Sequence, residues 1–370
     1  MKDDPTLPRQ PRLRAWFPGG SLLWPLAGLG ALLLFNLVFA TGFFRLELRD
    51  GHVYGTLVDI LNQGSKAMLL SIGMTLVIAS GGVDLSVGSL MAISGAVAAT
   101  AVAKGTVPFG AAVGAALAAG GFAGLCNGFL VAVVRIQPIV ATLILMVAGR
   151  GIAMLLTDGQ IVTFEHPAFV FLGNGHLAGL PFTLFLVLLS LGATALVMRR
   201  TAAGLFLESV GDNERAAALC GISGTRVKLW VYAFSGLCAA LAGLVATSNV
   251  KAADSSRVGE MMELDAIFAV VVGGTSLTGG RFTLLGSLIG AILIQTLTTT
   301  LYNLGLEPAT LDDGALVVPR HRLAQPLEDG GRGEALLLGV DHVRLGEDRA
   351  ASGDGGALPG TDRQRAHLLD

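Results

Sequence analysis

The sequence predicts an all-α polytopic membrane protein, with about nine transmembrane helices around a glycine-rich core of broken helices. Apolar residues make up 52% of the chain and charged residues only 14%, whereas a soluble domain usually carries about 25% charged residues. Long apolar runs recur along the chain, and most of them approach the roughly 20 residues that cross a bilayer. The 51 glycines are typical of close helix packing and interrupted helices in membrane bundles.

Nine apolar segments account for the predicted crossings, to within a few residues at each end. The first follows a basic, proline-rich stretch, and its apolar core is longer than that of a signal peptide, which favours an uncleaved helix. The eighth is short and interrupted by glycines, which favours a re-entrant segment. The predicted spans are residues 21–40, 57–80, 83–103, 109–134, 139–156, 181–198, 227–250, 264–277 and 284–304.

Lysine and arginine set the predicted orientation, because they are enriched in cytoplasmic loops. Three arginines before the first span place the N-terminus in the cytoplasm, and loop 158–180 then faces outward. The basic residues that this topology places inside are Arg9, Arg12, Arg14, Arg135, Arg199, Arg200, Arg215, Arg226, Lys228 and Arg281. Lys104, Lys251 and Arg257 are the exceptions on the outside.

A polar island, residues 199–228, separates the sixth and seventh spans and predicts a short helix on the cytoplasmic side. Asp212 can cap its start, Glu214 stands in its first turn, and Gly221 can end it. Ala216, Leu219 and Cys220 would share one face of this helix. The pattern fits a docking element for a partner, and it also fits an ordinary connecting loop.

Asp84 lies among glycines between the second and third spans, in the stretch ASGGVDLSVGSL. A carboxylate at membrane depth is costly unless water or a partner is near, and unwound backbone there normally lines a cavity. Asp84, Ser86 and Ser89 are therefore candidates for a pathway or hinge element. The alternative is a helix-capping aspartate in a cytoplasmic turn.

Arg150 interrupts the fifth apolar span, about 18 Å along its helix. Its guanidinium can bond polar groups in a central cavity or extend to the outer interface. Glu263 and Asp265 begin the eighth span, where an acidic first turn suits a helix N-terminus without further function. Asn127 and Thr142 are expected to be interhelical hydrogen-bond donors.

The sequence lacks the motifs of an enzyme. It contains no G-x-x-x-x-G-K-[ST], no H-E-x-x-H and no G-x-S-x-G. Its histidines and its three cysteines have no ligand spacing, so we expect no metal, cofactor or disulfide framework. A net charge of −2 gives no reason to expect nucleic-acid binding.

Four blocks of this chain resemble a known family, in family order. They are residues 73–99 (GMTLVIASGGVDLSVGSLMAISGAVAA), 135–164 (RIQPIVATLILMVAGRGIAMLLTDGQIVTF), 208–244 (with ESVGDNERAAALCGI and YAFSGLCAALAGL) and 263–294 (ELDAIFAVVVGGTSLTGGRFTLLGSLIGAILI). These blocks are similar to the inner-membrane permeases of bacterial ABC sugar importers, in the ribose-type branch. The second block is most similar to galactofuranose permeases.

The resemblance implies a lipid-embedded transport subunit of the bacterial inner membrane that is not itself an enzyme. It implies translocation of a monosaccharide such as galactofuranose or ribose, with separate ABC ATPase subunits, a periplasmic sugar-binding protein and a second permease subunit, identical or related. The implied ATPase-coupling loop comprises Glu208, Gly211, Asp212, Asn213, Glu214, Ala216, Ala217, Gly221 and Ile222. Our candidate translocation-pathway residues are Asp84, Ser86, Asn127 and Arg150. An ion-driven secondary sugar transporter is the alternative function.

The chain changes character near its end. We expect a cytoplasmic tail over residues 1–20, a permease domain over 21–305, and a polar, disordered tail over 306–370. The family normally continues with one more apolar segment that returns to the cytoplasm. Polar sequence replaces that segment here, as a reading-frame change near Pro308 would produce.

Overall fold

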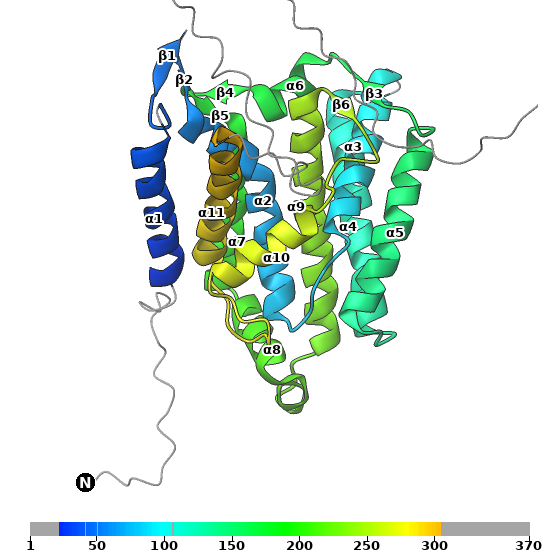
Figure 1. Cartoon of the computed structure of the whole chain (residues 1–370). Helices are drawn as coiled ribbons and strands as arrows, with labels where there is room; N and C mark the ends of the chain where they lie inside the picture. The colour runs from blue at the N-terminus through cyan, green and yellow to red at the C-terminus, as the bar shows by residue number, and fades with distance from the viewer. Residues whose placement is uncertain (1–21, 41, 50, 106, 305–370) are drawn as a thin grey trace, which may run out of the picture. The chain divides into compact units, whose positions relative to one another are not determined.

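The computed structural model describes residues 22–40, 42–49, 51–105 and 107–304, all within one compact unit of the chain. Eleven helices form this part (Figure 1). They are α1 (Leu23–Phe39), α2 (Thr56–Ala79), α3 (Val87–Ala103), α4 (Phe109–Ala132), α5 (Pro138–Leu156), α6 (Pro167–Asn174), α7 (Phe182–Arg200), α8 (Ala203–Leu219), α9 (Gly224–Val250), α10 (Met262–Val272) and α11 (Leu284–Asn303). The expected tails, residues 1–20 and 306–370, lie outside the described residues.

The strands are very short and form three antiparallel pairs. β1 (Glu47–Arg49) pairs with β2 (His52–Tyr54), β3 (Val162–Thr163) with β6 (Ala252–Ala253), and β4 (His176–Leu177) with β5 (Leu180–Pro181). All three pairs lie at the upper end of the bundle in Figure 1, opposite α8. The fold is therefore all-α, as predicted, with small hairpins and ladders at one end.

Each of the nine predicted spans coincides with a helix. Five of these helices, α4, α5, α7, α9 and α11, are long and apolar enough to cross a membrane, and α1 and α3 are shorter apolar helices. The predicted extent of the eighth span is wrong, because α10 covers only Met262–Val272. Gly273 and Gly274 follow it, and Gly274 has a φ of 87°, so the chain leaves the helix at these glycines.

The longest helix, α9, packs against α4 with almost no side chain between the two backbones. A Cβ on Gly236 of α9 would meet the carbonyl oxygen of Gly120, and it would lie 3.1 Å from the Cα of Gly124. Small residues permit this approach, which supplies van der Waals contact between helices where lipid removes the hydrophobic driving force. The glycines of α4 and α9 thus hold these two helices together.

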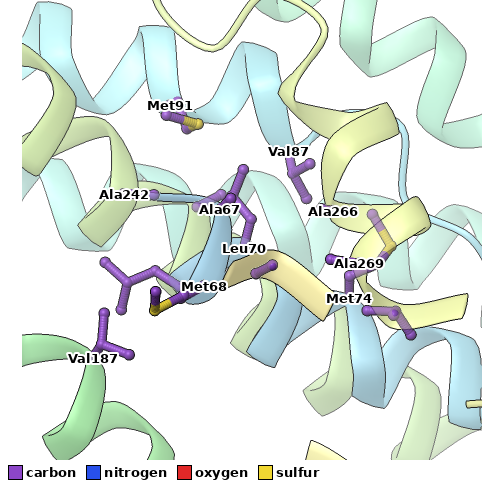
Figure 2. Packing of buried hydrophobic residues seen from close by; sticks show 14 of the residues in the cluster. Ala67, Met68, Leu70, Met74, Val87, Met91, Val187, Ala242, Ala266 and Ala269 are labelled. Carbon is purple, nitrogen blue, oxygen red and sulfur yellow. The ribbon is translucent and has the colours of Figure 1, made fainter. Parts of the chain in front are cut away.

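α2 lies inside the bundle, and most of its residues are buried. Figure 2 shows the cluster around it, in which Met68, Leu70 and Met74 of α2 lie near side chains of four other helices. These neighbours include Val87 and Met91 of α3, Val187 of α7, Ala242 of α9, and Ala266 and Ala269 of α10. This packing holds α2 in place inside the bundle. The candidate functional site includes the C-terminal end of this helix, at Ala79.

Candidate functional site

The polar island folds into α8, which consists of two helical pieces joined at a kink. Asn213 has φ −156° and ψ 98°, so it interrupts the helix. Its side-chain oxygen accepts a hydrogen bond from the backbone N–H of Ala216 at 3.0 Å. The predicted cap at Asp212 is therefore wrong by one residue: Asn213 has the extended backbone that an N-cap requires.

Gly221 ends α8, as the sequence predicted. Its φ is 81°, a conformation that glycine adopts without steric cost. The backbone N–H of Ile222 donates to the Ala217 carbonyl at 3.0 Å, and that of Gly221 donates to the Ala218 carbonyl at 3.0 Å. This is the Schellman arrangement of a helix C-terminus.

The second piece of α8 presents an uncovered face. Ala216, Leu219 and Cys220 are all exposed, whereas Ala217 on the opposite side of the helix is buried against the bundle. Leu219 is 91% exposed. The predicted shared face therefore exists, and it carries an unburied apolar side chain on α8, at the opposite end of the bundle from the strand pairs (Figure 1).

The first piece of α8 touches the end of α2 through glycines. A Cβ on Gly211 would meet the Ala79 carbonyl oxygen and would lie 2.5 Å from the Gly280 nitrogen. The Gly280 N–H donates to that same Ala79 carbonyl at 3.0 Å. Asp212 lies against Gly280 in turn. This glycine junction joins α8 to α2 and to loop 273–283.

Two carboxylates of the island lie near cationic side chains of other elements. Partial burial raises the pKa of Glu208, and the nearby Arg281 partly offsets this rise. Glu214 forms an ion pair with Lys228 of α9, with 2.7 Å between Oε2 and Nζ. A Cβ on Gly224 would lie 2.5 Å from Glu214 Oε1. Glu214 therefore packs on the first turn of α9.

A second polar cluster, which we call the Asp84 hub, lies inside the bundle and consists of Asp84, Ser86, Asn127 and Ser235. All four residues are buried, and three of them are fully inaccessible. Asp84 Oδ1 accepts hydrogen bonds from the Ser86 N–H (3.0 Å), the Ser86 hydroxyl (2.6 Å) and, more weakly, Asn127 Nδ2 (3.5 Å). Asp84 Oδ2 accepts one from Ser235 Oγ at 3.0 Å.

The hub joins three helices. Ser86 precedes α3, Asn127 belongs to α4 and Ser235 to α9, and Asn127 Nδ2 also donates to Ser86 Oγ at 2.7 Å. Asp84 bonds the backbone N–H of Ser86 at the start of α3, as the helix-capping alternative expects, and it is fully buried among the three helices. Asn127 is an interhelical donor, as expected. Thr142 is not, because its hydroxyl donates to Pro138 and Ile139 of its own helix.

Arg150 of α5 bonds polar groups inside the protein. Its Nη1 donates to the Ser255 carbonyl at 3.1 Å and to the Val258 carbonyl at 2.6 Å. Both carbonyls belong to segment 254–261, an irregular stretch that precedes α10. The Thr157 and Ser255 hydroxyls, 3.1 Å apart, add a second link between α5 and this segment. Arg150 thus holds irregular backbone against α5.

Segment 254–261 meets the start of α3, directly after a second irregular segment, residues 80–86, which joins α2 to α3. Gly88, in the first turn of α3, touches Gly259 of segment 254–261, so that neither residue has room for a Cβ. Glu263, in the first turn of α10 as predicted, lies against Gly88. The start of α3 carries the Asp84 hub, and segment 254–261 carries the carbonyls that Arg150 binds. Segment 254–261 therefore connects Arg150 to the start of α3, which carries the Asp84 hub.

Sequence reasoning missed several members of these clusters: Ser235, Ser255, Val258, Gly259 and Gly280. It also missed Gly279 of the glycine junction, where a Cβ would lie 2.8 Å from the Gly211 carbonyl oxygen. A single serine in an apolar helix has no periodic pattern, and a carbonyl acceptor carries no residue preference. The SLTGGRF stretch offered a signal for Gly279 and Gly280, since paired glycines mark turns. Both have positive φ, 86° and 82°.

Comparison with known proteins places these clusters in context. Residues 56–316 match the family described as the branched-chain amino acid transport system / permease component. The galactofuranose transporter permease protein of Escherichia coli K12 is 47% identical over 291 residues, covering 77% of this chain and 85% of that protein. The fructose import permease protein of Bifidobacterium longum is 37% identical, covering 78% and 82% of the two chains.

The ribose import permease protein of Escherichia coli K12 is 40% identical over 255 residues, covering 68% of this chain and 79% of that protein. No solved structure matches the chain. The family match covers more than half of the chain, and it contains α8, the Asp84 hub and Arg150. The chain therefore belongs to the branched-chain amino acid transport system permease family, and it is a multi-pass membrane permease subunit of an ABC transporter, a transport component and not an enzyme.

Proposed function

We propose that this permease translocates a monosaccharide, of the galactofuranose, ribose or fructose kind, into the cell. The observation that carries the proposal is the set of relatives: three that cover two thirds or more of this chain are named as permeases for sugars. The chain offers no ATP-binding motif of its own, so the energy enters through separate ATPase subunits. A periplasmic sugar-binding protein supplies the substrate, and a second permease subunit, identical or related, completes the path.

The proposed arrangement has nine crossings, made by α1–α5, α7 and α9–α11, with α3 and α10 as the helices that follow broken segments. α8 then lies on the cytoplasmic side and the three strand pairs lie outside. The two arginines that end α7, Arg199 and Arg200, support this orientation because basic residues stay inside.

α8 is the proposed contact for the ATPase, through Glu208, Gly211–Glu214, Ala216, Ala217, Gly221 and Ile222. Its exposed face offers Leu219 to a partner, and its glycine junction passes any displacement to α2 and to loop 273–283. α2 continues into the Asp84 hub, and loop 273–283 follows α10. A displacement of α8 would therefore be transmitted to both irregular segments, residues 80–86 and 254–261. Rigid-body movement of the helices joined to them would open the path alternately to each side of the membrane.

Asp84, Ser86, Asn127 and Arg150 are the proposed translocation-pathway residues. Their hydrogen bonds support a positioning role, since they hold the two irregular segments in the bundle. Irregular backbone at membrane depth is tolerated where protein buries it or water lines it. Movement of either segment would expose these polar groups to the path.

Reconstitution in proteoliposomes tests the proposal. The permease, its ATPase and its binding protein should take up labelled sugar only with ATP inside the vesicle. Uptake by the permease alone, driven by a sodium or proton gradient, would instead establish the ion-driven alternative. Matched vesicles without the binding protein serve as the control for delivery.

Cysteine labelling tests the orientation. Cys220 is exposed and must first be replaced by serine, so that Ser223→Cys is the labelled position on the polar island. An impermeant maleimide should label Ser223→Cys in inside-out vesicles and not in spheroplasts. Labelling from the external face alone would place α8 outside and remove the ATPase contact.

A further inference from the structure

We propose that the cavity beside the second piece of α8 binds a phosphate group. The cavity has a volume of about 640 Å³ and lies between the α4–α5 turn, α8 and the start of α9. This volume suits a small ligand, since ligand sites commonly measure about 300–1,000 Å³. Its polar and charged lining includes Arg135, Gln137, Arg215, Ser223, Thr225 and Lys228.

The charge of the lining favours an anion. Three cationic side chains face one carboxylate, Glu214, which is already paired with Lys228 at 2.7 Å. Within the described ranges, neither Arg135 nor Arg215 forms an ion pair. The two arginines come from different elements, the α4–α5 turn and α8. A guanidinium matches the oxygens of a phosphate through two parallel N–H donors.

The start of α9 adds backbone donors to the same cavity. Ser223 is the N-cap of this helix, and its hydroxyl accepts a hydrogen bond from the Arg226 N–H. Gly224 and Thr225 form the first turn and also line the cavity. The first N–H groups of a helix lack partners within it, and the helix dipole attracts negative charge there. Here this general preference reinforces the two arginines.

The end of α4 sets the position of Arg135. Its φ is 65°, the left-handed conformation that often ends a helix. The Ile136 N–H donates to the Leu130 carbonyl at 3.0 Å and closes this end. Arg135 is therefore held at the cavity by the backbone of the α4–α5 turn.

A bound phosphate would bridge Arg135 on the α4–α5 turn and Arg215 on α8. It would therefore hold the second piece of α8 to the bundle and oppose its displacement. This regulatory consequence rests on the proposed function of α8, but binding itself does not. Two sources carry the required chemistry: free inorganic phosphate and the headgroup of an anionic phospholipid.

The test uses the full-length permease purified in detergent. Inorganic phosphate is titrated against a chloride control of equal ionic strength, while the melting temperature is followed. In a second arm, the permease is placed in nanodiscs of phosphatidylglycerol and, separately, of phosphatidylcholine. Native mass spectrometry then measures how much lipid the permease retains from each. Arg135→Gln and Arg215→Gln should each weaken binding about tenfold or more. Arg226→Gln is the matched control, since Arg226 is exposed on the same island and does not line the cavity.

A saturable rise with phosphate that both cavity variants lose assigns the site to free phosphate. Retention of phosphatidylglycerol that both variants lose assigns it to lipid. The proposal is overturned if neither phosphate nor phosphatidylglycerol binds, or if binding survives in both variants. Arg215→Gln lies on an exposed helical position, so its result stands even if Arg135→Gln misfolds. Absence of ATP-driven uptake would contradict the proposed function but would not change the conclusion about phosphate binding.

Discussion

Replacing Asp84 separates a hydrogen-bonding role from a charge role. The carboxylate accepts three hydrogen bonds of 3.0 Å or shorter and one of 3.5 Å, and no described cation pairs with it. Asp84→Asn keeps Oδ1 for the Ser86 donors, and the Ser235 hydroxyl can rotate to accept from the new amide. Asp84→Ala removes every acceptor at once. We therefore expect the two variants to lower the free energy of unfolding by different amounts.

The magnitudes follow from the donors that are left behind. In Asp84→Ala the Ser86 N–H has no acceptor, and a buried unsatisfied donor costs about 1–3 kcal/mol. The lost side-chain volume adds a packing cost, so we expect a total of about 2–5 kcal/mol. The serine hydroxyls can rotate to helix carbonyls and add little. Asp84→Asn is isosteric and removes a buried charge, whose desolvation is itself costly, so we expect a change within about 1 kcal/mol.

The assay is the apparent melting temperature of the purified permease in one detergent, read by size-exclusion fluorescence. Ser209→Ala is the matched control, because Ser209 lies on α8 and its hydroxyl bonds only the Leu205 carbonyl of its own helix. The order of stability should be wild type, Asp84→Asn and Ser209→Ala together, then Asp84→Ala well below. An Asp84→Asn variant as unstable as Asp84→Ala would refute the reasoning, because the charge would then be essential. An Asp84→Ala variant as stable as wild type would refute it as well.

Three further predictions concern α8 and Arg150. Gly211→Val should lower the free energy of unfolding by about 1–3 kcal/mol, because the new side chain overpacks against the Ala79 carbonyl, and it should uncouple ATP hydrolysis from uptake. The control Gly114→Ala, at a position with open space around it, should have neither effect. Full coupling in Gly211→Val would contradict the role of the glycine junction. Gly221→Ala should weaken the end of α8 by about 1 kcal/mol, seen as faster hydrogen exchange over residues 214–221; unchanged exchange would show that the Schellman end is not limiting. Arg150→Leu should leave two carbonyls of segment 254–261 without their donor and reduce uptake while assembly with the ATPase persists; unchanged uptake would show that the segment holds itself in place.

Several features followed from the sequence because they depend on local pattern. Apolar runs of span length located nine helices, since lipid demands about 20 apolar residues of any crossing. The polar island located the second piece of α8 and Gly221, the glycine just past its C-terminal end. The cap was misplaced to Asp212, because aspartate and asparagine are equally good caps and only backbone geometry selects Asn213. The length of α10 was overestimated, because the predicted span was carried through Gly273 and Gly274 to Leu277, and these two glycines end the helix.

The sequence by itself determined that this chain is a membrane protein, which of its segments become helices, and that a polar island separates two of them. Only the tertiary structure decided which polar residues meet. Asp84, Asn127 and Ser235 are up to 151 positions apart along the chain, and no spacing rule brings them together. Their contact depends on glycines that let α4 and α9 approach closely, and close approach is a property of packed backbones. Local pattern decides which segments become helices, whereas the shape of their surfaces decides which of them touch.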